Sequence, residues 1–338
     1  MQQSPTPDAG RSDAARPGSV RPQPATGTGT SAAIVTYNPE LTLLKTVIAA
    51  VVPQVDAVLV IDNSEDPALM RATEALCGST GVVHEWMGVN LGIGEAHNVA
   101  IRWSIERGDR FLVLLDQDST PAHDMVAALR TVLTRRQDAG ERVAAAGPCY
   151  GYEPGVVDSF FLQFRFPLHR RFYADTLPAG TVIRTDCLIS SGTLFSTSAL
   201  AEVGEMRGDF FIDHVDTEWF LRASADGFHA YGVRDAVMTH ALGDGTLKLW
   251  FGHWRNYPLH VPERCYYTFR NSLKLYREPY ANAAWMLFDL YRLFAMFVIS
   301  VTRAPNRVAN LRNILRGLRD GLRLRGGSAA PSAPRERP

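Results

Sequence analysis

The stretch that decides the fold is Phe111-Leu-Val-Leu-Leu-Asp-Gln-Asp-Ser119, an apolar run followed by two aspartates one residue apart. A continuous apolar run of this length predicts a strand that is buried on both faces of a parallel sheet. Asp116 and Asp118 then lie at the edge of the sheet where open α/β sheets bind ligands. Two such carboxylates suit Mg²⁺ or Mn²⁺, which can hold a diphosphate. The alternative is that both aspartates cap the Ser-Thr-Pro turn that follows.

Two earlier segments show the same pattern of a buried strand that ends in polar residues. The first runs from Ser31 into Thr36-Tyr37-Asn38, and the second runs from Ala57 into Asp62-Asn63. Helical spacing between the strands, over 41–52 and from Asn90 to about Arg107, predicts an α/β fold with a mostly parallel sheet. Because parallel strands end at one edge of the sheet, all three polar ends are expected to meet in one crevice.

The middle of the chain is less regular. The aromatic and basic segment 152–185 is expected to form hairpin or loop structure over the open edge of the sheet. Further strands are predicted at 188–195 and 229–238, and we expect the second to be the last strand of the fold. A loop that leads into a helix is predicted at 210–225.

Composition excludes several classes of protein. The net charge is +0 over 338 residues, so the chain has no general attraction for nucleic acid. The four cysteines lie far apart and form no CxxC pair, which argues against a zinc site or a disulfide framework and fits a reducing compartment.

The chain is expected to divide into four parts. Residues 1–30 and 326–338 are rich in Pro, Gly, Ser and Ala and are predicted to be disordered. A nucleotide-binding domain is expected over 31–275 and a helical extension over 276–325. Because 1–30 lacks the apolar core of a signal peptide, we expect a cytoplasmic protein.

The helical extension has the pattern of a membrane-surface segment. Residues 283–301 are apolar, but Asp289 and Arg292 interrupt them and disfavour a membrane-spanning helix. Leucines then repeat at helical spacing with arginines beside them, at positions 311, 315, 318 and 322 and at 312, 316, 319 and 323. Such a helix can lie in a membrane interface with its leucines buried. The alternative is a helix packed on the catalytic domain with a solvated basic face.

Seven segments together resemble glycosyltransferase family 2, whose members are inverting enzymes of the GT-A fold. They occur in the family's order and span about residues 31–275. The resemblance is greatest to the rhamnosyltransferase branch, mainly through LDQDS and DTEW. The segments are VTYNPE at 35–40, VIDNS at 60–64, NLGIGEAHN at 90–98, LDQDS at 115–119, SSGTLF at 190–195, FIDHVDTEWFLRA at 211–223 and HALGD at 240–244.

The resemblance implies a role for each matching residue. Thr36, Tyr37 and Asn38 would line the nucleotide pocket, and Asp62 would accept a hydrogen bond from the pyrimidine N–H. Asp116 and Asp118 would bind the cation and the diphosphate, and His240 would complete the metal shell. Asp216 would be the catalytic base that takes the proton of the acceptor hydroxyl.

Several of these residues also have simpler explanations. Asp216 could be only the N-cap of a helix over 217–225, and Asp213 or Glu218 could be the base in its place. His240 could be an ordinary structural histidine. Gly92 and Gly94 fit a helix N-terminus near a phosphate, and Asn90 and Asn98 could contact the sugar nucleotide or only fix this turn.

The function that these features favour is transfer of L-rhamnose from dTDP-β-L-rhamnose to a lipid-linked saccharide in bacterial surface-glycan synthesis, with Mg²⁺ or Mn²⁺ as cofactor. The enzyme would lie peripherally on the inner face of the cell membrane. Within the same class, UDP-galactofuranose or a UDP-hexose is the alternative donor. A sugar nucleotidyltransferase is disfavoured because the first loop, Thr36-Tyr-Asn-Pro-Glu40, has neither Gly nor Lys or Arg. A non-catalytic membrane assembly subunit is disfavoured by the intact aspartates.

Overall fold

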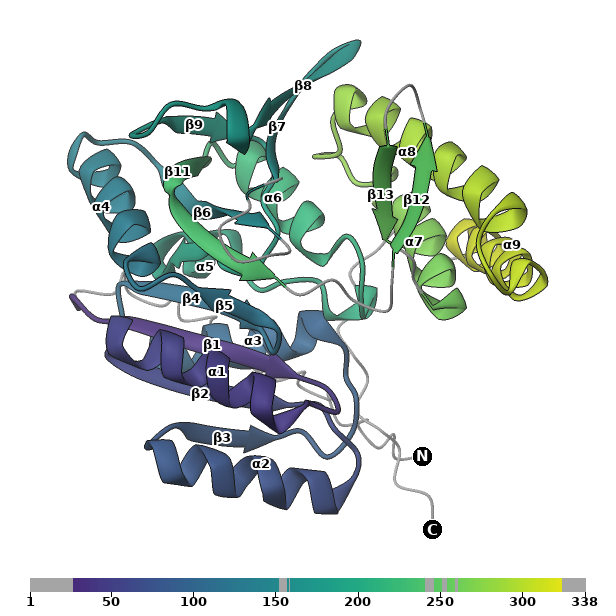
Figure 1. The fold of residues 1–338 in the computed structure, drawn as a ribbon. Coiled ribbons are helices and arrows are strands. Elements are labelled where there is room, and N and C mark those ends of the chain that lie inside the picture. The colour runs from purple at the N-terminus through teal and green to yellow at the C-terminus, as the bar shows by residue number, and fades with distance from the viewer. Residues whose placement is uncertain are drawn as a thin grey trace, which may run out of the picture.

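The computed structural model describes residues 27–151, 157, 159–240, 246–250, 254–258 and 261–323 (Figure 1). Most of the N-terminal segment and the whole C-terminal tail that were predicted to be disordered lie outside these residues. So do Gly243 and Asp244 of the HALGD segment.

The N-terminal half is a parallel sheet in the strand order β3-β2-β1-β4. Each apolar run predicted to be a strand is one, and the residues of β1 and the first five of β4 are buried. The strands are β1 (Thr30–Thr36), β2 (Ala57–Asp62), β3 (Val83–Trp86) and β4 (Phe111–Asp116). The helices that connect them are α1 (Leu41–Val51), α2 (Pro67–Thr80) and α3 (Ile93–Glu106).

The sheet continues beyond β4 with a mixture of directions. The short strand β10 (Leu194–Ser196) lies antiparallel between β4 and β6 (Val143–Gly151), and β11 (His229–His240) runs parallel to β6. At the far edge, β5 (Ser119–Pro121) and β9 (Val182–Thr185) pair with β11 in antiparallel fashion. The strand predicted at 188–195 is therefore much shorter than expected, because residues 188–193 form a turn beside the end of β4.

Helices cover both faces of this sheet, as the predicted α/β class requires. Alternate residues of β1 enter different cores: Ala32 and Ile34 pack with α1 and α4 (Met125–Asp138), and Ala33 and Val35 pack with α3 and the helices of the second half. Those helices are α5 (Thr197–Val203) and α6 (Val215–Ala225). The two cores fix the register of β1, because a one-residue slip would exchange its faces.

The segment predicted as hairpin or loop forms a hairpin of β7 (Phe160–Arg165) and β8 (Leu168–Tyr173). The prediction that 229–238 would be the last strand is wrong. A second hairpin, β12 (Thr246–Trp250) and β13 (Trp254–Pro258), follows it. Residues 246–249 (TLKL) alternate between polar and apolar, which is the pattern of an antiparallel strand.

The C-terminal part is helical, with α7 (Pro262–Leu275), α8 (Ala283–Thr302) and α9 (Arg307–Arg323) grouped beside the sheet (Figure 1). Helices α7 and α9 approach closely at Gly317, where a Cβ atom would lie 2.4 Å from the carbonyl oxygen of Tyr266. Helix α8 packs against β7 and β8. The helical extension therefore contacts the rest of the domain at the β7–β8 hairpin.

Candidate active site

One cavity of about 890 Å³ lies at the carboxyl ends of β1 and β4, where the sequence predicts a crevice. Side chains from both halves of the chain line it. Eight of the twelve predicted site residues are among them, namely Thr36, Tyr37, Asn90, Gly92, Asp116, Asp118, Asp216 and His240. The other four, Asn38, Asp62, Gly94 and Asn98, are not part of its lining.

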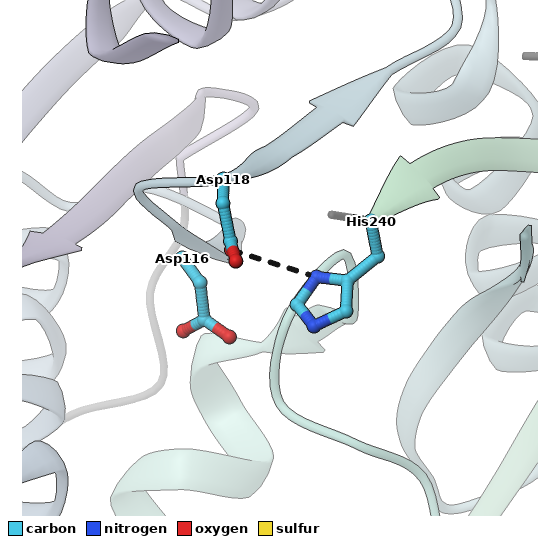
Figure 2. A group of neighbouring side chains, drawn as sticks. All are labelled: Asp116, Asp118 and His240. Carbon is cyan, nitrogen blue, oxygen red and sulfur yellow. Dashed lines mark ion pairs between the residues drawn. The ribbon is translucent and has the colours of Figure 1, made fainter. Parts of the chain in front are cut away.

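Asp116, Asp118 and His240 form a cluster in this cavity, and one ligand atom from each lies within 4.8 Å of the others (Figure 2). The backbone pairing of β5 with β11 sets His240 opposite Ser119, which brings the imidazole to the two aspartates. Opposite ligands of Mg²⁺ are about 4.2 Å apart, so the spacing and the oxygen and nitrogen donors fit a divalent cation.

A chain of hydroxyl groups supports this cluster from behind. The Ser119 hydroxyl lies 2.6 Å from His240 Nδ1, and the Ser191 hydroxyl donates to Ser119 Oγ at 2.7 Å. The backbone N–H of Asp116 donates to Ser191 Oγ at 3.1 Å. Both serines lie within the LDQDS and SSGTLF segments, but nothing in those segments predicted a role for them. They orient the imidazole, as groups behind metal-binding histidines commonly do.

The electrostatics of the cluster favour a bound cation. Burial raises the pKa of Asp116 to about 6, and the negative charges of Asp118 and Asp216 add to the rise. His240 and Arg264 act in the opposite direction. Gathering carboxylates in a cavity costs free energy that a divalent cation would offset.

The predicted nucleotide-binding loop is held by a buried acid. Asp62 is fully buried, and its Oδ1 accepts hydrogen bonds from the Thr36 hydroxyl at 3.1 Å and the Ser64 amide at 2.9 Å. Its Oδ2 makes no hydrogen bond within the described chain and lies 3.6 Å from His84 Nε2. Thr36 thus lines the cavity while Asp62 stands behind it, and Asp62 fixes the loop that a nucleotide would meet.

Gln117, between the two aspartates, was not among the predicted residues. Its side-chain carbonyl accepts a hydrogen bond from the backbone N–H of Tyr37 at 2.8 Å. This bond ties the loop after β1 to the loop after β4. Gln117 also lines the cavity together with Asp116 and Asp118.

The glycines at the start of α3 allow close packing against the loop that precedes α6. Gly92 has φ +84°, and a Cβ atom on it would lie 2.5 Å from the carbonyl oxygen of Phe211. A Cβ atom on Gly94 would lie 2.8 Å from the carbonyl oxygen of Arg207. The Asn98 side chain bonds both the N–H and the C=O of Met206, at 2.8 and 3.0 Å. These residues position the loop of the candidate base.

That loop has an unusual backbone. Phe211, Asp213 and His214 all have positive φ, which costs free energy for residues other than glycine. The buried Asn271 holds it: its Nδ2 lies 2.8–2.9 Å from the carbonyl oxygens of Phe210, Ile212 and Asp213. No pattern in the sequence marks Asn271, because its partners are about sixty residues away.

Asp216 lies in the first turn of α6, and His214 is the N-cap residue, so Asp216 does not cap the helix. Its Oδ1 accepts from the backbone N–H of Thr217 at 2.7 Å. Burial raises the pKa of Asp216, the amides of Thr217 and Ser190 lower it, and the charge of Asp213 adds to the rise. A carboxylate with a raised pKa is a better proton acceptor near neutral pH.

The two acids that competed with Asp216 are differently placed. Asp213 lines the cavity and forms an ion pair with Arg264 at 2.7 Å. Glu218 is fully buried, pairs with Arg222 at 3.0 Å and accepts from the Tyr280 hydroxyl at 2.6 Å. Glu218 therefore has a structural role, and Asp213 supports the loop.

Helix α8 reaches the candidate base through His214. The Arg292 guanidinium lies 2.8 Å from His214 Nε2, and Arg292 also donates to Asp289 at 2.9 Å. Because a guanidinium only donates, Nε2 accepts and the imidazole carries its proton on Nδ1. Burial lowers the pKa of His214 to about 4, so the ring is neutral. In the sequence, Asp289 and Arg292 are recognisable only as interruptions of an apolar helix.

Comparison with known proteins bears on the relatives and the fold of this chain. No family model matches the chain. It is 29% identical over 303 residues to a protein of Shigella flexneri named dTDP-rhamnosyl transferase RfbF, and the match covers 88% of this chain and 96% of that protein.

Solved structures show the same fold at low sequence identity. Staphylococcus aureus TarS 1–349 in complex with UDP-GlcNAc is 14% identical with a TM-score of 0.54, over 87% of this chain and 81% of that one. The mannosyltransferase PcManGT of Pyrobaculum calidifontis in complex with GDP-Man and Mn²⁺ is 14% identical with a TM-score of 0.53, over 91% of each chain. The chain thus has the GT-A fold, and the predicted fold class and family resemblance are confirmed.

Proposed function

We propose that this chain is a metal-dependent inverting glycosyltransferase that transfers L-rhamnose from dTDP-β-L-rhamnose to a lipid-linked saccharide. One observation carries the proposal: Asp116, Asp118, His240 and Asp216, from three separate parts of the chain, line a single cavity in a GT-A fold. The negative charge of Asp216 also acts on Asp116, so the two acids lie within electrostatic range of each other.

The donor nucleotide would occupy the end of the cavity formed by β1 and the start of α3. Thr36, Tyr37 and Asn90 line this end, and Asp62 and Asn38 hold the loop in place. Because Gly92 has no side chain, the backbone at the start of α3 can lie close to the loop before α6, which carries Phe211. The same backbone would also lie close to the donor. Gly94 and Asn98 would act indirectly, through the packing of that loop.

Asp116, Asp118 and His240 would hold Mg²⁺ or Mn²⁺, which neutralises the charge of the leaving diphosphate. Ser119 and Ser191 would keep His240 in position for this task. Because the carboxylates must be ionised to bind a cation, the raised pKa of Asp116 makes binding depend on pH.

Asp216 would take the proton from the acceptor hydroxyl while its oxygen attacks the anomeric carbon from the face opposite the diphosphate. A single displacement of this kind inverts the anomeric configuration. The raised pKa of Asp216 and the fixed loop before it support this role. A well-placed base contributes about 10²–10⁴-fold to the rate.

The choice of donor rests on the relative from Shigella flexneri, whose name states dTDP-rhamnosyl transfer. The aligned region covers 88% of this chain and 96% of that protein. The solved structures contain other nucleotide sugars and bear on the fold alone.

Contact with the inner face of the cell membrane is supported by the C-terminal helices. Helix α8 is long and apolar enough to cross a membrane, by length and composition. Its inner face, however, carries the buried Asp289, and its outer face exposes Leu290, Tyr291 and Phe294 to more than half of their area. This arrangement fits a helix that lies in the membrane interface with its apolar face outward.

Helix α9 adds a basic surface to this apolar face. Leu315 and Leu322 are exposed, although the helix packs on α7 through Gly317 and Gly321. A groove where α8 meets α9 is lined by five arginines, at positions 303, 307, 312, 316 and 319. Arginines beside exposed leucines complement anionic phospholipid headgroups. An acceptor on a lipid carrier would reach the enzyme at this surface.

A nucleotide screen tests the proposal directly. The melting temperature is measured with Mn²⁺ and each of dTDP, UDP and GDP, and again with EDTA in place of Mn²⁺. Preferential stabilisation by dTDP that needs Mn²⁺ is expected. Equal stabilisation by UDP would instead indicate the alternative UDP-linked donors, and no effect of any nucleotide would contradict the glycosyltransferase assignment.

A further inference from the structure

The end of the cavity away from the nucleotide loops is lined by aromatic rings. Phe160 of β7 and Phe288 of α8 both line the cavity, and both are half-buried. Trp285 lies nearly one helical turn before Phe288 and belongs to the same wall. The roles proposed above for donor, cation and base use none of these rings.

Residues of β7 and β8 hold the two half-buried rings in place. The Arg171 guanidinium lies 4.9 Å from the ring centre of Phe160 and 6.0 Å from that of Phe288. Its Nε is buried and makes no hydrogen bond to any described residue, so the rings are its main contacts there. The rings of His169 and Phe164 pack on Phe288 with centres 4.7 and 5.5 Å away. Packing thus fixes both rings in advance of any ligand.

The candidate base lies in the same cavity, beside a segment that adjoins β7. Its carboxylate is hydrogen-bonded by the backbone of Ser190 and Thr217. The segment that contains Ser190 adjoins β7, because Cys187 pairs with Leu162. A molecule that brings a hydroxyl group within about 3 Å of Asp216 would lie next to the segment that adjoins β7, the strand that carries Phe160.

We propose that Phe160 and Phe288 form an aromatic platform that binds a sugar ring of the acceptor. The face of an aromatic ring is electron-rich, and the C–H bonds on one face of a pyranose are weakly positive, so the two surfaces attract each other. Hydroxyl groups on the ring's edge stay free to meet Asp216. The ligand class is an acceptor saccharide, and this inference rests on the proposed glycosyltransferase function.

The test compares aromatic and aliphatic side chains of similar size. Phe160→Leu and Phe288→Leu remove a ring face but keep an apolar side chain, and Phe288→Tyr keeps the ring. Phe294→Leu is the matched control, because it lies on the exposed outer face of the same helix. Acceptors are the methyl and octyl glycosides of rhamnose, N-acetylglucosamine and galactose, with dTDP-rhamnose and Mn²⁺.

Each cavity Leu variant is expected to raise the acceptor KM about 3- to 10-fold, with the donor KM unchanged. Phe288→Tyr and Phe294→Leu are expected to behave like the wild type. In each Leu variant, the acceptor KM should rise by the same factor for the methyl and the octyl glycoside of one sugar. A loss confined to the octyl glycosides would mean that the rings hold an alkyl chain, which would overturn the platform.

Two further readouts separate the possible failures. Without acceptor, water can take the place of the acceptor hydroxyl, and slow hydrolysis of dTDP-rhamnose then releases dTDP. This reaction depends only on the donor and cation sites. Its absence in the wild type would contradict the proposed function. Normal release combined with unchanged acceptor KM in both Leu variants would contradict the platform alone. Saturation-transfer NMR of the methyl glycosides measures binding without turnover, and no contact with the wild type would also overturn the platform.

Discussion

At the scale of single residues, the site depends on acids whose charges act on one another. The Asp216 carboxylate raises the pKa of Asp116, and burial raises the pKa values of both. The two acids have different proposed tasks: Asp116 must stay ionised to hold a cation, and Asp216 must accept a proton. Because the charge of Asp216 affects the pKa of Asp116, replacing Asp216 should produce a measurable change in the pKa of Asp116.

Replacement of the candidate base tests its role directly. Asp216→Asn keeps the size of the side chain and removes its ability to accept a proton. We expect transfer to fall by about 10²–10⁴-fold while Mn²⁺-dependent binding of dTDP, measured by calorimetry, persists. Asp213→Asn is the comparison variant, since that acid lines the same cavity but pairs with Arg264. Near-normal turnover by Asp216→Asn would remove it as the base.

The affinity for Mn²⁺ should depend on pH through Asp116. A carboxyl with a pKa of about 6 is protonated below that pH, and a proton competes with the cation. The affinity measured by calorimetry is therefore expected to fall about tenfold per pH unit below 6 and to level off above it. In Asp216→Asn, loss of a negative charge lowers the pKa of Asp116. The pH at which the affinity for Mn²⁺ begins to fall, the midpoint of this dependence, should therefore move to a lower value. An unchanged midpoint would show that the two acids do not interact.

At the scale of elements, the geometry depends on how the start of α3 meets the loop before α6. Gly92 and Gly94 remove the side chains that would keep the two apart, and Asn271 of α7 holds the loop from its other side. Three residues of positive φ in that loop are maintained by these contacts. The base is thus positioned by two helices that contribute no catalytic group.

Gly92→Ala tests this packing. Its φ of +84° and ψ of 170° are accessible almost only to glycine, and a Cβ atom would also collide with Phe211. We expect the free energy of unfolding to fall by about 3 kcal/mol or more, measured with denaturant. Gly81→Ala is the control, because it has φ +70° but open space around it, and about 1 kcal/mol is expected. Equal losses in both variants would mean that the collision has no effect.

At the scale of the whole molecule, exposed apolar side chains are concentrated in the C-terminal helices. Helix α8 buries the charged Asp289 and exposes Leu290, Tyr291 and Phe294, whereas a surface helix of a water-soluble protein turns its charged residues outward. The same helix supplies Phe288 to the cavity. The proposed membrane surface and the proposed acceptor platform are therefore two faces of one helix.

Charge placed on the outer face of α8 should weaken membrane binding. Tyr291→Glu with Phe294→Glu replaces two side chains that are each 67% exposed. Binding to vesicles of mixed neutral and anionic phospholipid, measured by sedimentation, is expected to fall at least about tenfold. Val83→Glu with Val89→Glu is the control, on exposed residues of the N-terminal half. Binding that is equal in both variants would contradict the interfacial helix.

The sequence by itself determined the local features of this protein. Apolar runs and helical spacing predicted β1, β2, β4 and α3, and the polar residues after each strand predicted the edge on which the cavity lies. Such features are encoded within a few residues, because strand burial and helix amphipathicity have short periods.

Tertiary structure alone decided which distant groups meet. His240 reaches Asp118 through the pairing of β11 with β5, and Asn271 reaches the loop of the candidate base from α7. Asp289 and Arg292 of α8 line the cavity and Tyr291 and Phe294 of the same helix are exposed, although its sequence alone does not say which side is covered. These contacts join residues about sixty or more positions apart, and they form only because the packing of both cores brings their elements together.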